Sequence, residues 1–145
     1  MPFYTASRSN TALSTSNDLL TLVSAASRRC YVHEISVGGM GIASSANELG
    51  IFRSTGGTTG GGALTPVKLV SDSPTASTLC YTSWAAQPSL SGDPLLRLTV
   101  NANGSIYRWV AKPGEEIEFR NAEQLSERAV VGVSSVSMHT IFEEV

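Results

Sequence analysis

The sequence predicts an all-β protein: a β-sandwich, jelly-roll-like, with an extended N-terminal arm. Three observations support this fold class. From Leu19 onward the chain breaks into short runs bounded by turn residues, and several runs alternate apolar with polar side chains, as half-buried strands do. No window of about a dozen residues repeats apolar side chains with the period of a helix. About eight or nine short strands at this spacing are typical of a β-sandwich, a jelly roll or a small barrel.

Residues 1–18 are rich in Ser, Thr and Asn and keep neither the period of a strand nor that of a helix. We expect them to form an extended arm outside a single β-sandwich domain at residues 19–145. The arm has too few apolar groups to offset the entropy of ordering it alone, so a neighbouring subunit or a larger surface should order it. A frayed terminus without a role is the alternative. Its candidate contacts with a partner are Phe3, Tyr4, Arg8 and Leu13.

The runs behind the arm are predicted to be strands. In one of them Tyr31, His33, Ile35 and Val37 should share a face, because successive side chains of a strand point to opposite sides of the sheet. The predicted strands cover residues 19–25, 30–37, 48–54, 66–70, 78–84, 95–101, 105–111, 115–120 and 129–142.

Turn residues predict how some of these strands connect. Asn103-Gly104 is the strongest turn signal and predicts a hairpin over residues 95–111. Lys-Pro-Gly at residues 112–114 predicts a second tight turn. In the last run the apolar positions change parity after Val133, which predicts either a bulge or a strand that bends from one sheet to the other.

The stretch STGGTTGGG, residues 54–62, raises the question of a phosphate site. A phosphate loop needs a lysine close to the glycines and a following helix, whereas this stretch leads through Thr65-Pro66 into a predicted strand. We expect a mobile loop between strands without a bound nucleotide, because glycine loses more conformational entropy on ordering than any other residue.

Composition limits the partners of the protein. A chain of 145 residues fits one domain, and its net charge of -2 gives no electrostatic reason to bind nucleic acid. Eight arginines against two lysines are typical of an interface, although composition bias explains the ratio equally well. We expect neither a membrane-spanning segment nor a secretion signal. Cys30 and Cys80 are expected to be free, largely buried thiols.

No catalytic, metal or cofactor site is predicted. His33 and His139 lie inside predicted strands, and no nucleophile elbow accompanies them, so a Ser-His-Asp triad is not supported. Cys30 and His33 lack a second ligand pair for zinc. The pair Glu143-Glu144 cannot converge on one substrate, because neighbours on a strand point to opposite faces, and we expect solvated edges there.

The two tryptophans are the remaining candidates for a binding role. Trp84 ends a predicted strand beside a Pro- and Gly-containing turn and is the better candidate for an exposed contact. Trp109 shares a strand face with Tyr107, which favours a place in the core over a sugar-stacking platform.

Three stretches of the chain resemble a group of small head proteins of tailed bacteriophages. They are RRCYVHEISVGGMGIASSANELGIFRSTGGTTGGGALTPVKL, LTVNANGSIYRWVAKPGEEIEF and the terminal MHTIFEE. The most specific element is R-W-V-A-x-P-G-E, here residues 108–115, and the resemblance covers most of residues 28–144.

The resemblance implies a capsid decoration (cement) protein, a non-enzymatic virion component that binds the outer capsid surface and stabilises the phage head. It implies the major capsid protein as partner, a homotrimer, synthesis in the host cytoplasm and a final place on the virion. A carbohydrate- or receptor-binding module of a phage tail or fibre is the alternative, in which Trp84 and Trp109 would stack on sugars. An enzyme such as an esterase or glycosidase is the weakest reading of these residues.

Overall fold

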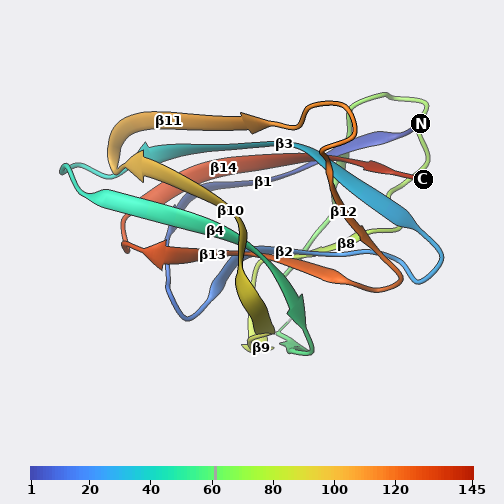
Figure 1. Cartoon of the computed structure of the whole chain (residues 1–145), viewed down its shortest axis with the longest axis horizontal. Coiled ribbons are helices and arrows are strands. Elements are labelled where there is room, and N and C mark those ends of the chain that lie inside the picture. Colours follow the sequence, from blue (N-terminus) through green and yellow to red (C-terminus); the bar gives the residue numbers. More distant parts are fainter. Residues whose placement is uncertain (61) are drawn as a thin grey trace.

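The computed structural model confirms the all-β class and the two-layer sandwich. It describes residues 1–60 and 62–145, and across these residues no helix occurs. Gly61, which belongs to the glycine-rich stretch 54–62, lies outside the described residues. Two antiparallel sheets face each other with the apolar core between them (Figure 1).

The first layer, called sheet A, is the upper one in Figure 1. β12 (Ile117–Arg120) pairs with β3 on the edge that also carries β11, so these two strands line one border of the sheet. The spatial order of the others is β11 (Asn103–Val110), β3 (Arg29–Met40), β14 (Ser135–Glu144), β1 (Phe3–Ala12) and β7 (Val67–Lys68).

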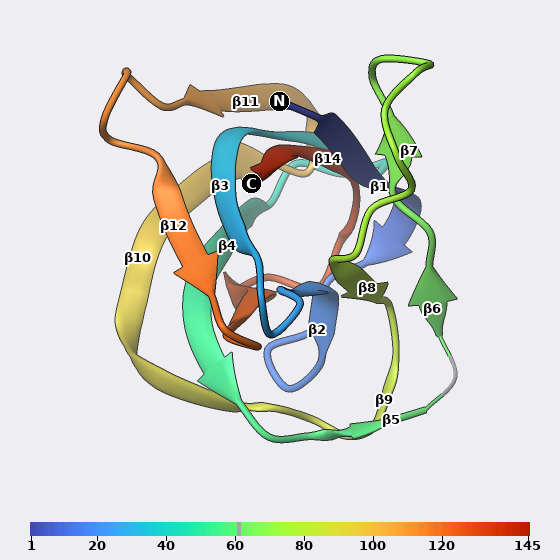
Figure 2. The ribbon, with the colours of Figure 1, turned by 90° about the vertical axis from the view of Figure 1, so that its right-hand side faces the viewer.

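The second layer, called sheet B, lies below sheet A in Figure 1. Its strands follow the order β10 (Ser89–Asn101), β4 (Ala46–Thr55), β13 (Gln124–Val131), β2 (Asp18–Val23), β8 (Leu79–Tyr81) and β6 (Ala63–Leu64). A separate ribbon of β5 (Thr58–Thr59) and β9 (Trp84–Ala86) lies at the far side from sheet A in Figure 2.

The chain passes from one sheet to the other at most of its long connections. β1 and β3 belong to sheet A, β2 and β4 to sheet B, and the same exchange occurs between β10 and β11 and between β13 and β14. Alternate side chains of each long strand therefore enter one shared interior. This order is compatible with the jelly-roll-like interpretation, which stays a prediction.

The hairpin predicted over residues 95–111 is wrong. β10 pairs with β4 and β11 pairs with β3, so the Asn103-Gly104 turn joins strands of different sheets. The chain crosses at Ala102, which is fully buried, donates its N–H to Ser45 O at 2.8 Å and accepts from Gly41 N at 2.7 Å. Gly104 has φ +73°, as expected of a glycine in a tight turn. A tight turn does not, however, specify whether the strands on either side of it pair with each other.

The parity change in the last run is explained by a second crossing. The run divides into β13 in sheet B and β14 in sheet A, as one of the two predicted alternatives required. Gly132 stands at this crossing with φ +95°, and a Cβ there would collide with the side chain of Asn47.

Residues 3–12 do not form an arm outside the domain. They are β1, which pairs with β14 from Phe3 to Ala12 and with β7 at Tyr4 and Thr5. Tyr4 and Ala6 point into the core, and the Tyr4 hydroxyl donates to Pro74 O at 2.9 Å. The expectation was wrong because this strand has few inward apolar side chains, and most of its order comes from main-chain pairing with the last strand of the same chain.

A bulge in β3 corrects the predicted face of that strand. His33 is an extra residue opposite β14, because Ile141 pairs with Glu34 while Phe142 pairs with Val32. Ile35 and Val37 therefore share the inner face with Val32, whereas His33 is only half-buried.

A carboxyl group lies between the two sheets. Glu127 on β13 is 1% exposed; its Oε1 accepts a hydrogen bond from Thr140 on β14 at 2.7 Å, and its Oε2 has no partner among the described residues. Burial raises the pKa of Glu127 to about 8, the Thr140 hydrogen bond opposes this rise and the Asp18 charge adds to it. The group is therefore protonated in the folded protein at neutral pH.

Glu127 predicts a pH dependence of stability. Between its ordinary pKa of 4.5 and about 8 the folded chain holds a proton that the unfolded chain has released, so the free energy of unfolding falls as pH rises across this window. One such proton corresponds to about 1.4 kcal/mol per pH unit. Urea unfolding from pH 4 to 9 should show this slope in the natural chain and a flatter one in Glu127→Gln, which stays neutral. Equal slopes in the two proteins would contradict the assignment.

Candidate functional site

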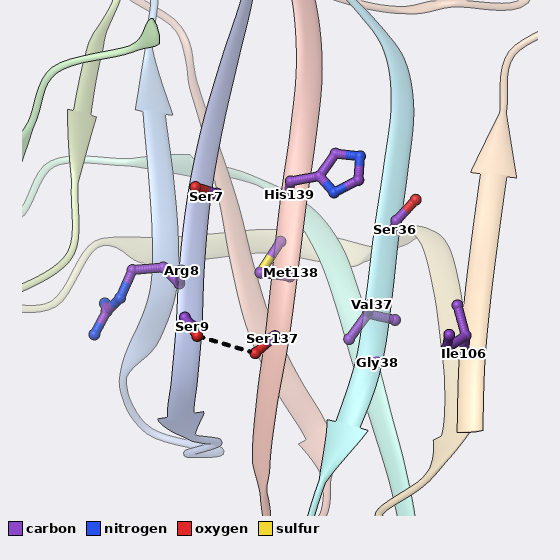
Figure 3. A pocket seen from close by; sticks show the side chains of 10 residues that line it. All are labelled: Ser7, Arg8, Ser9, Ser36, Val37, Gly38, Ile106, Ser137, Met138 and His139. Carbon is purple, nitrogen blue, oxygen red and sulfur yellow. Dashed lines mark hydrogen bonds between the residues drawn. The ribbon is translucent and has the colours of Figure 1, made fainter. Parts of the chain in front are cut away.

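A shallow groove runs along the outer face of sheet A. Its floor consists of small outward residues, such as Ser9, Ser137 and Gly38, on neighbouring strands between β1 and β11 (Figure 3). Because these residues are small, the outer face is hollowed there. Ser9 Oγ lies 3.4 Å from Ser137 Oγ across β1 and β14, and Ile106 stands on β11 at the opposite side. The groove encloses about 480 Å³ and is lined by Ser7, Arg8, Ser9, Ser36, Val37, Gly38, Ile106, Ser137, Met138 and His139.

An ion-pair cluster lies on the same face. Arg108 on β11 donates from Nε and Nη2 to the two carboxylate oxygens of Glu34 on β3, at 2.7 and 2.6 Å. Ser36 donates to Glu34 Oε1 at 3.2 Å, and His139 Nε2 lies 3.4 Å from the same atom. The Arg108 hydrogen bonds lower the pKa of Glu34 to about 2. A carboxylate with so low a proton affinity is a poor general base at neutral pH, so the cluster fixes the face rather than activating a substrate.

Large apolar side chains are exposed along the β11 side of this face. Ile106 is 79% exposed and Val110 51%, and Met40, opposite Asn103 on β3, is 51% exposed. We call Met40, Ile106 and Val110 the β11 apolar strip. Tyr107, 41% exposed, points to the other face of β11, because successive side chains of a strand alternate. Exposed apolar side chains gathered at one border of a sheet are typical of a protein contact.

A buried hydrogen-bond network lies on the outer face of sheet B, beneath the connection that carries β9. Asp18 Oδ1 accepts from Arg128 Nε at 2.6 Å, and its Oδ2 accepts from Thr21 at 2.7 Å and from Ser126 at 2.5 Å. Arg128 Nη2 also donates to Pro88 O at 3.0 Å, and the Asp18 N–H donates to Gln87 Oε1 at 2.9 Å. The network ties the segment before β10 to sheet B. It contains a serine and an aspartate but no histidine, so it lacks the base of a catalytic triad.

Trp84 belongs to this network instead of forming an exposed contact. Its Nε1 donates to Thr21 Oγ1 at 2.9 Å, its ring centroid lies 5.0 Å from that of Tyr81, and the side chain is half-buried. The ring also explains part of the glycine-rich stretch. A Cβ on Gly57, where φ is +86°, would lie 2.9 Å from the ring, so the close approach requires glycine. Part of the predicted loop is thus the strand β5, paired with β9.

The acidic pair at the end of β14 does not form a solvated edge, contrary to the prediction. Glu143 is 6% exposed and its Oε2 lies 3.0 Å from His33 Nε2. Glu144 is 4% exposed and accepts from the backbone N–H groups of Ser77 and Thr78 and from the Thr78 hydroxyl. These donors offset the cost of burying the carboxylates, which sequence alternation alone could not reveal.

Cys30 and Cys80 are free and buried, as predicted. Cys30 Sγ lies 2.9 Å from Thr78 Oγ1. Burial raises the pKa of Cys30 to about 11 and raises that of Cys80 still further, so neither thiol is a nucleophile at neutral pH.

The residues proposed as partner contacts are not brought together. Tyr4 and Leu13 are buried in the core of their own chain, and Phe3 packs against His33 with ring centroids 5.2 Å apart. Arg8 points away from the groove, toward sheet B, where its Nη1 donates to Leu19 O at 2.8 Å and to Thr82 O at 3.1 Å (Figure 3). Each of these side chains, like Trp84, contacts its own chain. Sequence reasoning missed the exposure of Ile106 and Val110 because the hairpin predicted over residues 95–111 gave their strand the wrong partner.

Within residues 1–60 and 62–145, no three His, Cys, Asp or Glu side chains gather in a way that could hold a metal ion. None of the elements described is a helix long and apolar enough to cross a membrane. Comparison with protein-family models gave no match, and comparison with curated proteins found no similar sequence.

The buried ion pair gives a stability prediction with a matched control. Asp18→Asn should cost about 3–5 kcal/mol of unfolding free energy, because it leaves the Arg128 guanidinium, 11% exposed, without a counter-charge. Glu48→Gln should cost less than ~1 kcal/mol, since its partner Arg97 is 50% exposed. Denaturant unfolding of both variants measures the difference. Similar small losses would show that the Asp18 charge is not needed for the fold.

Proposed function

We propose that the protein is a non-enzymatic structural protein of a tailed-phage virion, which binds the outer surface of the capsid and stabilises the head. The observation that carries the proposal is the outer face of sheet A, a groove of small side chains bordered by the β11 apolar strip. Such a face offers an apolar contact area to a protein partner, while the neighbouring charges are already paired with each other. The resemblance of the motifs to phage head proteins supports the same assignment.

The partner proposed is the major capsid protein, and the final location is the capsid surface after synthesis in the host cytoplasm. Self-association into a homo-oligomer belongs to the same proposal. The trimer that the resemblance implies is one candidate stoichiometry, and capsid attachment does not depend on it.

The carbohydrate-binding alternative has less support from the geometry. A sugar platform needs an exposed aromatic face, but Trp84 is held by Thr21 and Tyr81, and Trp109 packs against the core. Tyr107 is an exposed aromatic residue of β11, but it points to the face of that strand opposite to Ile106 and Val110 and so lies outside the groove face.

Binding to capsids tests the proposal. The purified protein should co-sediment with phage capsids assembled without it, and it should raise the temperature at which those capsids open. Ser137→Arg, which fills the floor of the groove, should weaken binding by at least about tenfold, or ~1.4 kcal/mol. Thr99→Arg, on the exposed face of β10, is the matched control and should bind like the natural chain.

Two outcomes would overturn the proposal. One is no binding to capsids by the natural chain. The other is saturable binding to a glycan panel, lost in Trp84→Ala and unaffected by Ser137→Arg, which would favour the tail or fibre module.

A further inference from the structure

β11 is the free edge of sheet A along the stretch from Ile106 to Val110. It pairs with β3 in continuous register there, and Ala111 N donates to His33 O at 2.8 Å at its end. Hydrogen-bonding direction alternates along an antiparallel strand, so Tyr107 and Trp109 point their backbone groups toward β3. The N–H and C=O groups of Ile106, Arg108 and Val110 therefore point outward from the sheet.

The other long edges of the sandwich carry features that block further pairing. β10 is interrupted by a register shift between Ser91 and Leu96, with Gly92 at φ +67° and Pro94 inside it. β1 is covered by β7 at Tyr4 and Thr5, and farther along its register with β14 shifts between Arg8 and Thr11, with Asn10 at φ +46°. In contrast, β11 is regular from residue 106 to 110, contains no proline, and exposes large apolar side chains on both faces. An edge of this kind is a template for another strand.

We propose that β11 pairs antiparallel with β11 of a second copy of this chain, about a two-fold axis beside Tyr107. This inference specifies the self-association of the chain, on which the proposed capsid attachment does not depend. The register that places residues 104–110 of both copies opposite each other uses almost the whole strand. It sets Tyr107 opposite Tyr107 at a position without direct hydrogen bonds, and Ile106 opposite Arg108, whose outward backbone groups then bond.

Charge and side-chain chemistry favour a second copy as the occupant. Arg108 is the one charged residue of β11 and is already neutralised by two hydrogen bonds from its guanidinium to Glu34, so two copies of the strand do not repel each other. The register above also keeps the two Arg108 side chains from standing directly opposite each other. Cross-strand aromatic pairs stabilise a sheet, and the two Tyr107 side chains, each 41% exposed in one chain, would lie side by side on the same face of the joined sheet.

A strand that pairs with its own copy closes after two chains, because the same patch serves both partners. The arrangement joins two copies of sheet A into one continuous sheet, with both groove faces on the same side. It therefore gives a dimer, in place of the trimer that the resemblance implies.

Light scattering on the purified full chain tests the inference without any capsid. The natural chain should have twice the mass of one chain, and Ile106→Lys should have the mass of one. Ile106 is 79% exposed, so the variant should keep the circular dichroism spectrum of the natural protein. Val133→Lys, at a position 73% exposed in the connection between β13 and β14, is the matched control and should stay dimeric.

Cross-linking tests the register. In the proposed register the two Tyr107 residues face each other at a position without direct hydrogen bonds, where facing Cα atoms lie about 4.5 Å apart. A disulfide spans this distance. Tyr107→Cys should therefore form a covalent dimer under mild oxidation, whereas Val133→Cys should not; the native thiols are buried. A monomeric or trimeric natural chain, an equal loss of dimer in the two lysine variants, or equal cross-linking of the two cysteine variants would overturn the proposal.

Discussion

The burial of two apolar sheet faces against each other is the constraint on which the rest of the structure depends. Because both sheets are assembled from strands that alternate along the chain, the connections must cross from one layer to the other without leaving a gap. Small residues make this feasible at the crossings. Ala102 fits between the layers with its backbone fully bonded, and Gly132 adopts a conformation closed to most residues while leaving room for Asn47. The fold therefore depends on the small residues at these crossings as well as on the apolar core.

A carboxyl group is buried on each side of sheet B, and the two groups are stabilised differently. Between the sheets, Glu127 has one hydroxyl donor and takes up a proton. On the outer face, Asp18 receives donors from Arg128, Thr21 and Ser126. The second arrangement also anchors Trp84 and the segment that leads into β10. The polar side chains of Asp18, Thr21 and Arg128 therefore attach β9 and the segment that follows it to sheet B.

Local pattern was enough to predict most strands and the fold class. Alternation located β2, β3, β4, β11 and β12 to within a few residues, because each has an inward apolar face. The N-terminal strand was missed because its inward side chains are Tyr4, Ala6 and the unusual Arg8. The predicted hairpin is wrong because β10 pairs with β4 and β11 pairs with β3. These partner strands are distant in sequence from β10 and β11, so the local turn signal does not reveal them.

The candidate site was less predictable than the fold. Trp84 carried the features of a surface aromatic residue, but its indole N–H finds Thr21, more than sixty residues away in sequence, as a partner. Glu143 and Glu144 were expected in solvent, and only the fold brings His33 and Thr78 to them. The exposed side of β11 could be recognised only after its partner strand was known, since Ile106 and Val110 are as apolar as any core residue.

The pairing of the first long strand with the last has a consequence for how the protein forms during synthesis. Phe3 lies opposite Glu143, and Glu144 N donates to Pro2 O at 3.2 Å, so the chain ends meet at one end of the sandwich (Figure 2). On the ribosome, β1 emerges more than a hundred residues before β14 and lacks this partner until β14 has been made. Contacts between such distant segments slow folding. Until then residues 3–12 lack the strand that provides most of their main-chain pairing, and β14 joins them to β3 in sheet A.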